Sequence, residues 1–184
     1  YDGVVNSMRH SSRCVIQMSE TEESNNEAIR RPNVNKYKSQ RSVLSSRKKD
    51  VTPKEINELF TRSGWTPRDE GKWKTALEMT YCVVSARLFK DQKLVGFARA
   101  TSDLGLNATI WDLAVDKDLP DPMLMKRNII TYILKEIRLE LPGCSVALIS
   151  RPEDVELFES LQFVADPDGI RAMALIDDDY PLML

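Results

Sequence analysis

The hydrophobic pattern between Leu94 and Asn128 changes from a strand period to a helical one. The segments LVGFARATSD (94–103) and ATIWDLAVD (108–116) are rich in apolar and β-branched residues, and Gly105 and Asn107 lie between them. This pattern predicts two strands joined by a short turn. A proline-marked loop, LPDP, follows and leads into a long helix. We expect the rest of the chain to pack around this strand, turn, strand and helix unit.

The long helix is predicted over MLMKRNIITYILKEIRLEL (123–141). Its apolar residues recur at helical spacing, while its charged residues face elsewhere. Pro142-Gly143 follows directly and predicts the end of the helix. The expected buried stripe consists of Ile130, Ile133, Leu134, Ile137 and Leu141.

A shorter helix has the clearest local start and stop signals in the chain. Thr52 is placed to cap it, Pro53 takes the first helical position, and Glu55 follows three residues after the cap. Gly64 is the predicted stop. The expected buried positions are Ile56, Leu59 and Phe60.

The remaining elements complete a mixed order. Strands are predicted at 42–46 and at 81–89, and the second of these is expected to pair with 94–103. A short buried strand is predicted at 145–150, and a final strand or hairpin limb over 163–177. Helices are predicted at 69–80 and 153–162. The order is therefore β-α-α-β-β-β-α-β-α-β. It predicts a mixed α/β fold, with one twisted sheet and helices on both faces.

The amino-acid composition limits the classes of protein to which this chain can belong. The chain has 184 residues, 42% of them hydrophobic and 29% charged, which is typical of one globular domain with a real core. No apolar run approaches the ~18 residues of a membrane span. The net charge of −2 gives no general case for binding nucleic acid. Three cysteines without CxxC spacing support neither a disulfide framework nor a zinc site, so no metal is expected.

Charge is unevenly distributed along the chain. Residues 1–50 hold ten Lys or Arg against six Asp or Glu, so a basic segment precedes an acidic remainder. Residues 1–40 have the composition of a flexible basic arm, and 41–184 are predicted to form a single domain. The arm is either a solvated linker or a docking arm that contacts a protein partner through Arg30-Arg31-Pro32 and Arg47-Lys48-Lys49. A C-terminal tail, the acidic run 177–179 followed by apolar YPLML, is a second candidate contact.

Four segments resemble a known family. VGFARATSD, NATIWDLAVD, LFESLQF and ADPDGIRAM occur in the order found in the GNAT superfamily of acetyl-CoA-dependent N-acetyltransferases. The resemblance runs from Val51 to Asp177 and is nearest to the plant plastid branch that includes the serotonin and lysine acetyltransferases. It implies a GNAT fold and a location in the chloroplast stroma.

The resemblance also implies a cofactor site. Acetyl-CoA would lie between the strands NATIWDLAVD and SVALIS, and a Q/R-x-x-G-x-G/A signature would bind its pyrophosphate at the start of the long helix. Here Pro120, Met123 and Met125 stand at the three signature positions. Lys126 matches a basic residue of the family. The implied cofactor-binding residues, which the substitutions would leave vestigial, are Leu113, Val115, Met123, Met125, Lys126 and Arg127.

The catalytic positions implied by the resemblance are altered too. Phe158 stands where the family often carries a tyrosine that protonates the departing thiolate, and a phenyl ring cannot donate a proton. Gln162 replaces a glycine of the same segment. Asp112 and Asp116 are candidate bases for the incoming amine, against the alternative that each is a turn or cap residue.

Two functional classes follow. The first is a plastid GNAT-like protein with weak or no acetyl transfer, which acts as a binding or structural subunit of a larger assembly and needs no cofactor. The second is a working N-acetyltransferase that moves acetyl from acetyl-CoA to a protein lysine, a protein N-terminus or an arylalkylamine. The changes strike both cofactor binding and acid catalysis, so the sequence favours the first class.

Overall fold

A computed structural model describes residues 41–171 and 173 of the chain. The arm predicted for residues 1–40 and the acidic and apolar tail at 177–184 lie outside these residues. The described part forms one twisted sheet with helices on both faces, which confirms the predicted α/β class.

The sheet has five strands in sequential order, β1-β2-β3-β4-β5. Pairing is antiparallel from β1 to β4, whereas β5 lies parallel to β4. The long α3 helix provides the crossover that this one parallel pair requires. The strands are β1 (Ser42–Ser45), β2 (Cys82–Leu88), β3 (Leu94–Ser102), β4 (Asn107–Val115) and β5 (Ser145–Leu148).

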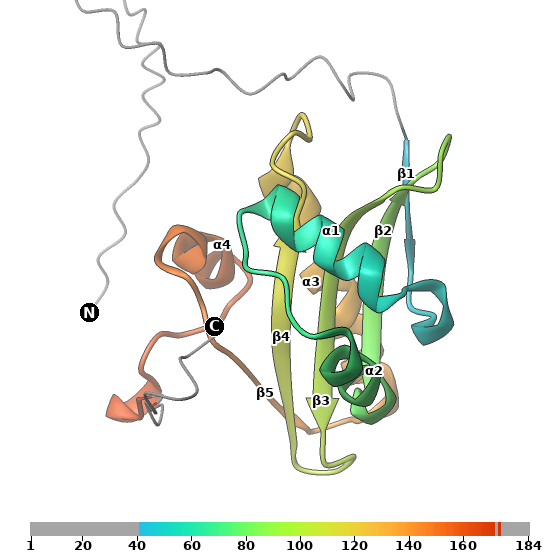
Figure 1. Ribbon diagram of the computed structural model, residues 1–184. Helices are drawn as coiled ribbons and strands as arrows, with labels where there is room; N and C mark the ends of the chain where they lie inside the picture. The colour runs from blue at the N-terminus through green and yellow to red at the C-terminus, as the bar shows by residue number, and fades with distance from the viewer. Residues whose placement is uncertain (1–40, 172, 174–184) are drawn as a thin grey trace, which may run out of the picture. The chain divides into compact units, whose positions relative to one another are not determined.

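Figure 1 shows α1 (Pro53–Ser63) and α2 (Glu70–Met79) in front of the sheet and α3 (Pro122–Glu140) behind it. The short helix α4 (Val155–Ser160) lies beyond β5, toward the C-terminal end of the chain. Three single 3₁₀ turns complete the described structure: η1 (Lys48–Asp50), η2 (Pro152–Asp154) and η3 (Pro167–Gly169). The predicted element order is thus confirmed from β1 through α4.

Each face of the sheet has its own core. Behind the sheet, the aliphatic stripe of α3 packs on β2, β3 and β4, and Ile130, Ile133 and Ile137 are at most 1% exposed. In front, the core is aromatic: Trp73 makes edge-to-face contacts with Phe60 and Phe97, whose ring centroids lie 5.4 and 5.9 Å away. These contacts fix α1 and α2 against β3 and hold the loop between the two helices near β4.

The predicted cap chemistry of α1 is confirmed. Thr52 accepts a hydrogen bond from the Glu55 backbone N–H, and the Glu55 carboxylate accepts one from the Thr52 backbone N–H. Gly64 ends the helix with φ at 77°, in the left-handed region. A side chain at this position would be strained, because residues other than glycine rarely adopt that conformation.

Gly64→Ala is therefore expected to lower the free energy of unfolding by about 1 kcal/mol. Gly71→Ala is the matched control, since Gly71 lies within helical backbone at the start of α2 and does not have a positive φ. Alanine is expected to cost less there, because helix propensity favours it, although its Cβ would lie 3.1 Å from the capping Asp69 Oδ1. Denaturant unfolding of the two variants measures the difference, and equal effects would contradict the assignment of strain to Gly64.

Two predictions for the C-terminal part are corrected. The strand at 145–150 is shorter, and β5 is half-buried at the edge of the described sheet rather than fully buried. The strand predicted over 163–177 is wrong for its described residues, which form bends and η3. The physical reason is local: Pro167 has no backbone donor, and Asp166 and Asp168 both adopt positive φ.

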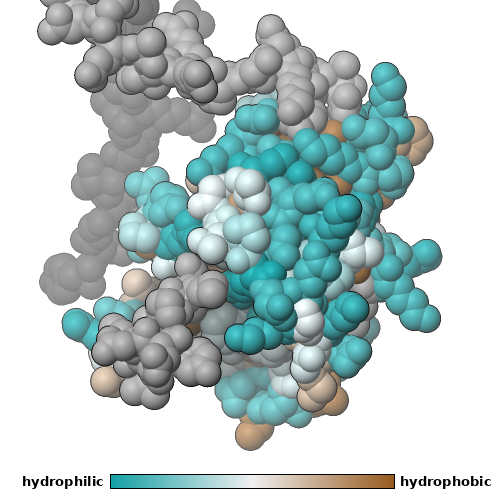
Figure 2. Space-filling model, viewed as in Figure 1, coloured by the Kyte–Doolittle hydropathy of each residue, from teal (hydrophilic) through white to brown (hydrophobic). Residues whose placement is uncertain are grey.

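Within residues 41–171 and 173, no helix has the length and apolar character needed to cross a membrane. The same residues bring together no group of three or more potential metal-binding side chains. Figure 2 shows that the face in front of the sheet is largely hydrophilic, with hydrophobic side chains at its margins.

Candidate functional site

The candidate site lies where β4 and β5 stop pairing. Parallel pairing joins Asn107–Ile110 to Ser145–Leu148, after which β5 ends and β4 continues to Val115. The last part of β4 therefore has no strand partner on this side in the described sheet. A small cavity of about 40 Å³ opens at this point, lined by residues of both strands together with Trp65, Asp154 and Phe158.

A β-bulge in β4 adjoins the cavity. The register with β3 shifts between the pairs Phe97↔Ala114 and Arg99↔Trp111, so that β4 contains one extra residue. Asp112 lies in this interval with φ at 60°, a conformation that is costly for a residue with a side chain. The bulge turns the Asp112 carboxylate toward two guanidinium groups in front of the sheet.

Asp112 accepts a 2.6 Å hydrogen bond from Arg99 Nε, and its other oxygen lies 3.0 Å from Arg68 Nη1. Its side chain is only 4% exposed. Both guanidinium groups also lie over the Trp73 ring. A general base needs a lone pair that points at the incoming proton. Because both Asp112 oxygens are bound by cations, this geometry favours a structural role for Asp112.

Asp116, the other candidate base, is fully buried at the end of β4. It accepts a 2.8 Å hydrogen bond from Arg62 Nε, and Lys93 Nζ lies 3.4 Å away. Burial alone would raise the pKa of Asp116, but the Asp118 backbone N–H, Arg62 and Lys93 outweigh it and lower the pKa below its ordinary value. A buried carboxylate held ionised by these partners fixes the position of α1 on the sheet.

The start of α3 is where the resemblance implies pyrophosphate binding, and two of its backbone N–H groups already donate to Asp121. Pro122, the first residue of α3, has no N–H. The Leu124 N–H donates to Asp121 Oδ1 at 2.8 Å, and the Met125 N–H donates to the Asp121 carbonyl at 3.3 Å. Asp121 thus places a carboxylate at the positive end of the helix dipole, where an anionic ligand would otherwise bind.

The predicted cofactor residues of β4 and α3 are mostly packed into the fold. Leu113, Val115 and Met125 belong to the core behind the sheet and are 8%, 4% and 9% exposed. Met125 lies near Gly96 of β3, at ordinary contact distance from where a Cβ would be, and Ile129 Cδ1 fills the space that a side chain at that glycine would need. Met123 is exposed at the helix surface. The side chains of Leu113, Val115 and Met125 therefore fill space between α3 and the sheet.

The two basic residues of this set bind α4 and the turn before it. Lys126 Nζ lies 2.5 Å from Asp154 Oδ1 in a mostly buried ion pair, and Arg127 donates to Ser160 Oγ at 2.8 Å. Both contacts join the N-terminal half of α3 to the segment after β5. The charge that Lys126 would offer to a phosphate is already balanced by the Asp154 carboxylate.

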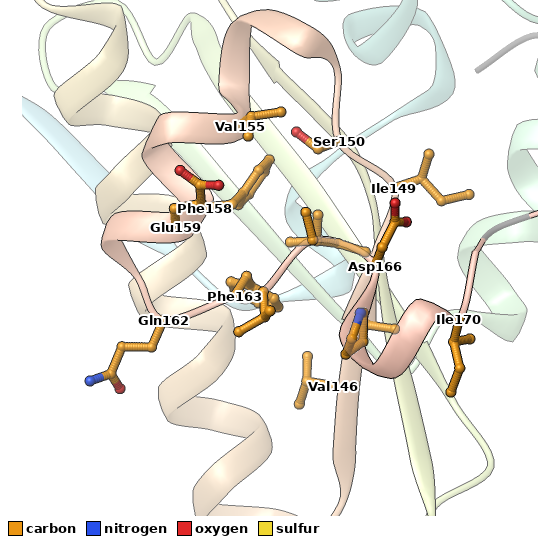
Figure 3. Close-up of a pocket in the computed structure, with 15 residues that line it drawn as sticks. Val146, Ile149, Ser150, Val155, Phe158, Glu159, Gln162, Phe163, Asp166 and Ile170 are labelled. Atoms are coloured by element: carbon orange, nitrogen blue, oxygen red, sulfur yellow. The ribbon is translucent and has the colours of Figure 1, made fainter.

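Phe158 separates the small cavity from a larger pocket. It is 6% exposed, lines both spaces, and packs edge-to-face on Phe163 with 5.8 Å between ring centroids. Figure 3 shows the larger pocket, about 510 Å³, between β5 and α4, with Phe158 and Phe163 on its wall. The Phe158 ring carries no hydroxyl, so this wall of the pocket offers no proton donor at that residue.

A cation–π contact joins two residues that line the small cavity. Arg151, after β5, places its guanidinium carbon 4.0 Å from the centroid of Trp65, in the loop between α1 and α2. Together with the Lys126–Asp154 pair, this contact joins the segment after β5 to elements on both faces of the sheet.

Sequence reasoning missed the four cations that hold Asp112 and Asp116, which are Arg62, Arg68, Lys93 and Arg99. It also missed Asp121, Asp154, Arg151 and Trp65. Asp121 could have been found, because an aspartate directly before proline at a helix start is a recognised cap pattern. Asp154, Arg151 and Trp65 carry no such signal, since their partners are distant in sequence.

Solved acetyltransferase structures share this architecture. A probable acetyltransferase of unknown function from meticillin-resistant Staphylococcus aureus matches 73% of this chain and 98% of its own, with a TM-score of 0.64 and 20% identity. The ribosomal-protein-S18-alanine N-acetyltransferase of Escherichia coli matches 66% of this chain and 76% of its own, with a TM-score of 0.52 and 21% identity. At this identity the likeness defines the fold, which is that of an acetyltransferase.

Curated relatives define the family more closely, although no family model matches the sequence. An uncharacterized N-acetyltransferase, ycf52, of Pyropia yezoensis is 35% identical over 135 residues, covering 72% of this chain and 76% of the relative. The chloroplastic GCN5-related N-acetyltransferase 1 of Arabidopsis thaliana is 35% identical over 123 residues, covering 66% of this chain and 61% of the relative. The chain belongs to the GNAT superfamily of N-acetyltransferases, in its plastid-type branch, which confirms the resemblance and the predicted plastid localisation.

Proposed function

We propose that this plastid GNAT protein has weak or no acetyl-CoA transfer activity and acts as a binding or structural subunit of a larger assembly. One observation carries the proposal: the N-terminus of α3 is capped by the Asp121 carboxylate. A pyrophosphate at this helix end would compete with Asp121 for the Leu124 N–H and would meet a like charge. The residues present therefore do not fit the cofactor.

Packing supports the same proposal. Glycines in a phosphate-binding loop let the backbone approach the ligand, whereas Met125 is buried against the sheet and cannot move aside without opening the core. Phe158 adds the loss of an acid, because its position carries no proton donor. These changes act on different steps of the reaction, so their effects on activity would multiply.

The partner-binding part of the proposal rests on charge. Ten basic residues lie among the first 50, and Arg47 and Lys49 are exposed at the point where the described structure begins. A basic segment beside a folded domain is suited to an acidic surface of a protein partner. The Arg30-Arg31-Pro32 cluster lies outside the described residues. We assign it, with Arg47, Lys48 and Lys49, to this contact.

A thermal-shift titration tests the cofactor half of the proposal. We expect no saturable rise in the melting temperature of the full chain with acetyl-CoA or CoA at millimolar concentration. A cofactor present at about 100 times its dissociation constant would stabilise the fold by about 2.7 kcal/mol, a rise of roughly 5–10 °C. Such a rise with acetyl-CoA would overturn the proposal and direct the search to acceptor amines.

The alternative function is an active N-acetyltransferase, and the names of the relatives favour it. A soybean relative, 30% identical over 180 residues, is named a histone acetyltransferase, and a rice relative, 31% identical over 124 residues, a chloroplastic serotonin N-acetyltransferase. The acceptors on this reading are a protein lysine, a protein N-terminus or an arylalkylamine, with acetyl-CoA as donor. The same titration separates the two functions, because a working enzyme must bind its cofactor.

A further inference from the structure

A groove of about 570 Å³ lies between the C-terminal half of α3 and the end of α4, next to the larger pocket beside β5. Its apolar side is formed by Leu134, Leu139 and Leu161, and Leu139 is 69% exposed. Two basic residues, Lys135 and Arg138, line the same groove and are exposed. The groove thus combines an exposed leucine, Leu139, and the partly buried Leu161 with positive charge.

The two cations have no counterion in the described part of the chain. No ion pair or hydrogen bond joins the side chain of Lys135 or Arg138 to another described residue, whereas Lys126 and Arg127 of the same helix are bound to Asp154 and Ser160. The neighbouring carboxylate of Glu140 accepts a hydrogen bond from the Tyr81 hydroxyl at 2.8 Å and is directed toward β2. The groove therefore suits an acidic segment that also carries apolar side chains.

We propose that this groove binds the C-terminal segment of the same chain, with Asp177, Asp178 and Asp179 against Lys135 and Arg138. This is the only run of three consecutive acidic residues in the sequence, and Tyr180-Pro-Leu-Met-Leu follows it directly. The segment therefore matches the groove in both respects, with carboxylates for the two cations and apolar side chains for the leucines.

The end of the described chain lies beside a pocket that adjoins the groove, which supports this occupant. Ile170, close to the last described residue Met173, lines the larger pocket beside β5. That pocket and the groove share Gln162 on their walls, so the two spaces adjoin (Figure 3 shows Gln162 at the rim of the pocket). The six residues from Ala174 to Asp179 can extend at most about 20 Å, and the proposed docking requires them to span the pocket from Ile170 to Gln162.

Tethering favours the chain's own segment over an external one. Exposed ion pairs are individually weak and screened by salt. A short covalent link gives the segment an effective concentration on the order of millimolar at the groove, which a partner protein would have to exceed. Docking of this tail on its own domain leaves the N-terminal arm as the contact segment of the proposed assembly.

Zero-length carbodiimide coupling of the full chain tests the docking directly. The reagent joins a lysine amine to a carboxylate that it contacts, and peptide mass spectrometry identifies the pair. An equal mixture of ¹⁴N- and ¹⁵N-labelled protein distinguishes coupling within one chain from coupling between two. We expect Lys135 coupled to Asp177, Asp178 or Asp179 in peptides of a single isotope, with a yield that falls severalfold in 1 M salt.

Matched variants separate docking from chance contact. Arg138→Glu should lower the Lys135 coupling at least about fivefold by repelling the acidic run, since charge complementarity holds it. Lys74→Glu, on the exposed surface of α2, should leave the coupling unchanged. The proposal is overturned if Lys72 and Lys74 couple to the acidic run as readily as Lys135 does, or if the products carry mixed isotopes, which would place the tail on a second copy.

Discussion

Asp116→Ala is expected to lower the free energy of unfolding by about 3 kcal/mol and the melting temperature by roughly 6–12 °C. The carboxylate is fully buried, and its loss leaves Arg62 and Lys93 beside an empty acceptor position. Their side chains remain 24% and 28% exposed, so water compensates them in part and the effect falls at the lower end for a buried pair. Scanning calorimetry measures it.

Glu58→Ala provides the control, because Glu58 is an exposed carboxylate on the same helix as Arg62, and its removal should change stability by less than about 0.5 kcal/mol. The effect of Asp116→Ala should also depend on pH. The folded-state pKa of Asp116 is lowered, so its contribution is present above the ordinary aspartate pKa of about 4 and is lost as pH falls through the folded value. A stability difference that persisted unchanged to about pH 2 would contradict this role.

Restoring the cofactor loop is expected to restore acetyl-CoA binding. The combined change Pro120→Gln, Asp121→Asn, Met123→Gly and Met125→Gly removes the carboxylate at the helix end and returns a loop that the pyrophosphate can approach. We expect acetyl-CoA affinity to rise at least about tenfold over the unchanged chain, measured by titration calorimetry. Phe158→Tyr, added afterwards, tests whether a proton donor then increases turnover.

The loop change has a cost that must be measured separately. Two glycines in the first turn of α3 destabilise a helix by about 1 kcal/mol each, and Met125→Gly also opens space in the core. Met125→Gly alone controls for that space, because it leaves Asp121 in place and should bind no cofactor. A folded combined variant without affinity would instead assign the loss to the contacts Lys126–Asp154 and Trp65–Arg151, which hold the segment after β5.

The predictions that were confirmed depend on residues close together in the sequence. The capping box at Thr52, the stop at Gly64 and the stripe of α3 were all predicted, because each depends on residues within one or two helical turns. Over its described residues, 163–171 and 173, the final strand was wrongly predicted, because the turn-forming residues Asp166 and Pro167 outweigh the apolar pattern around them. The start of α3 was placed one residue late, at Met123, since the cap signal of Asp121-Pro122 was overlooked.

The sequence by itself determined the class of fold and the family, and its resemblance to that family predicted which positions of the cofactor signature have changed. It did so because hydrophobic periodicity, helix caps and sequence motifs are formed by residues that lie close together in the chain. Only the tertiary structure shows which contacts the residues at those positions make. The Asp121 cap lies at the start of α3, the bulge in β4 directs Asp112 toward Arg68 and Arg99 in front of the sheet, and the Lys126–Asp154 pair joins α3 to the turn before α4. Most of these partners lie far apart in sequence, and their contacts exist only once the sheet and helices have packed.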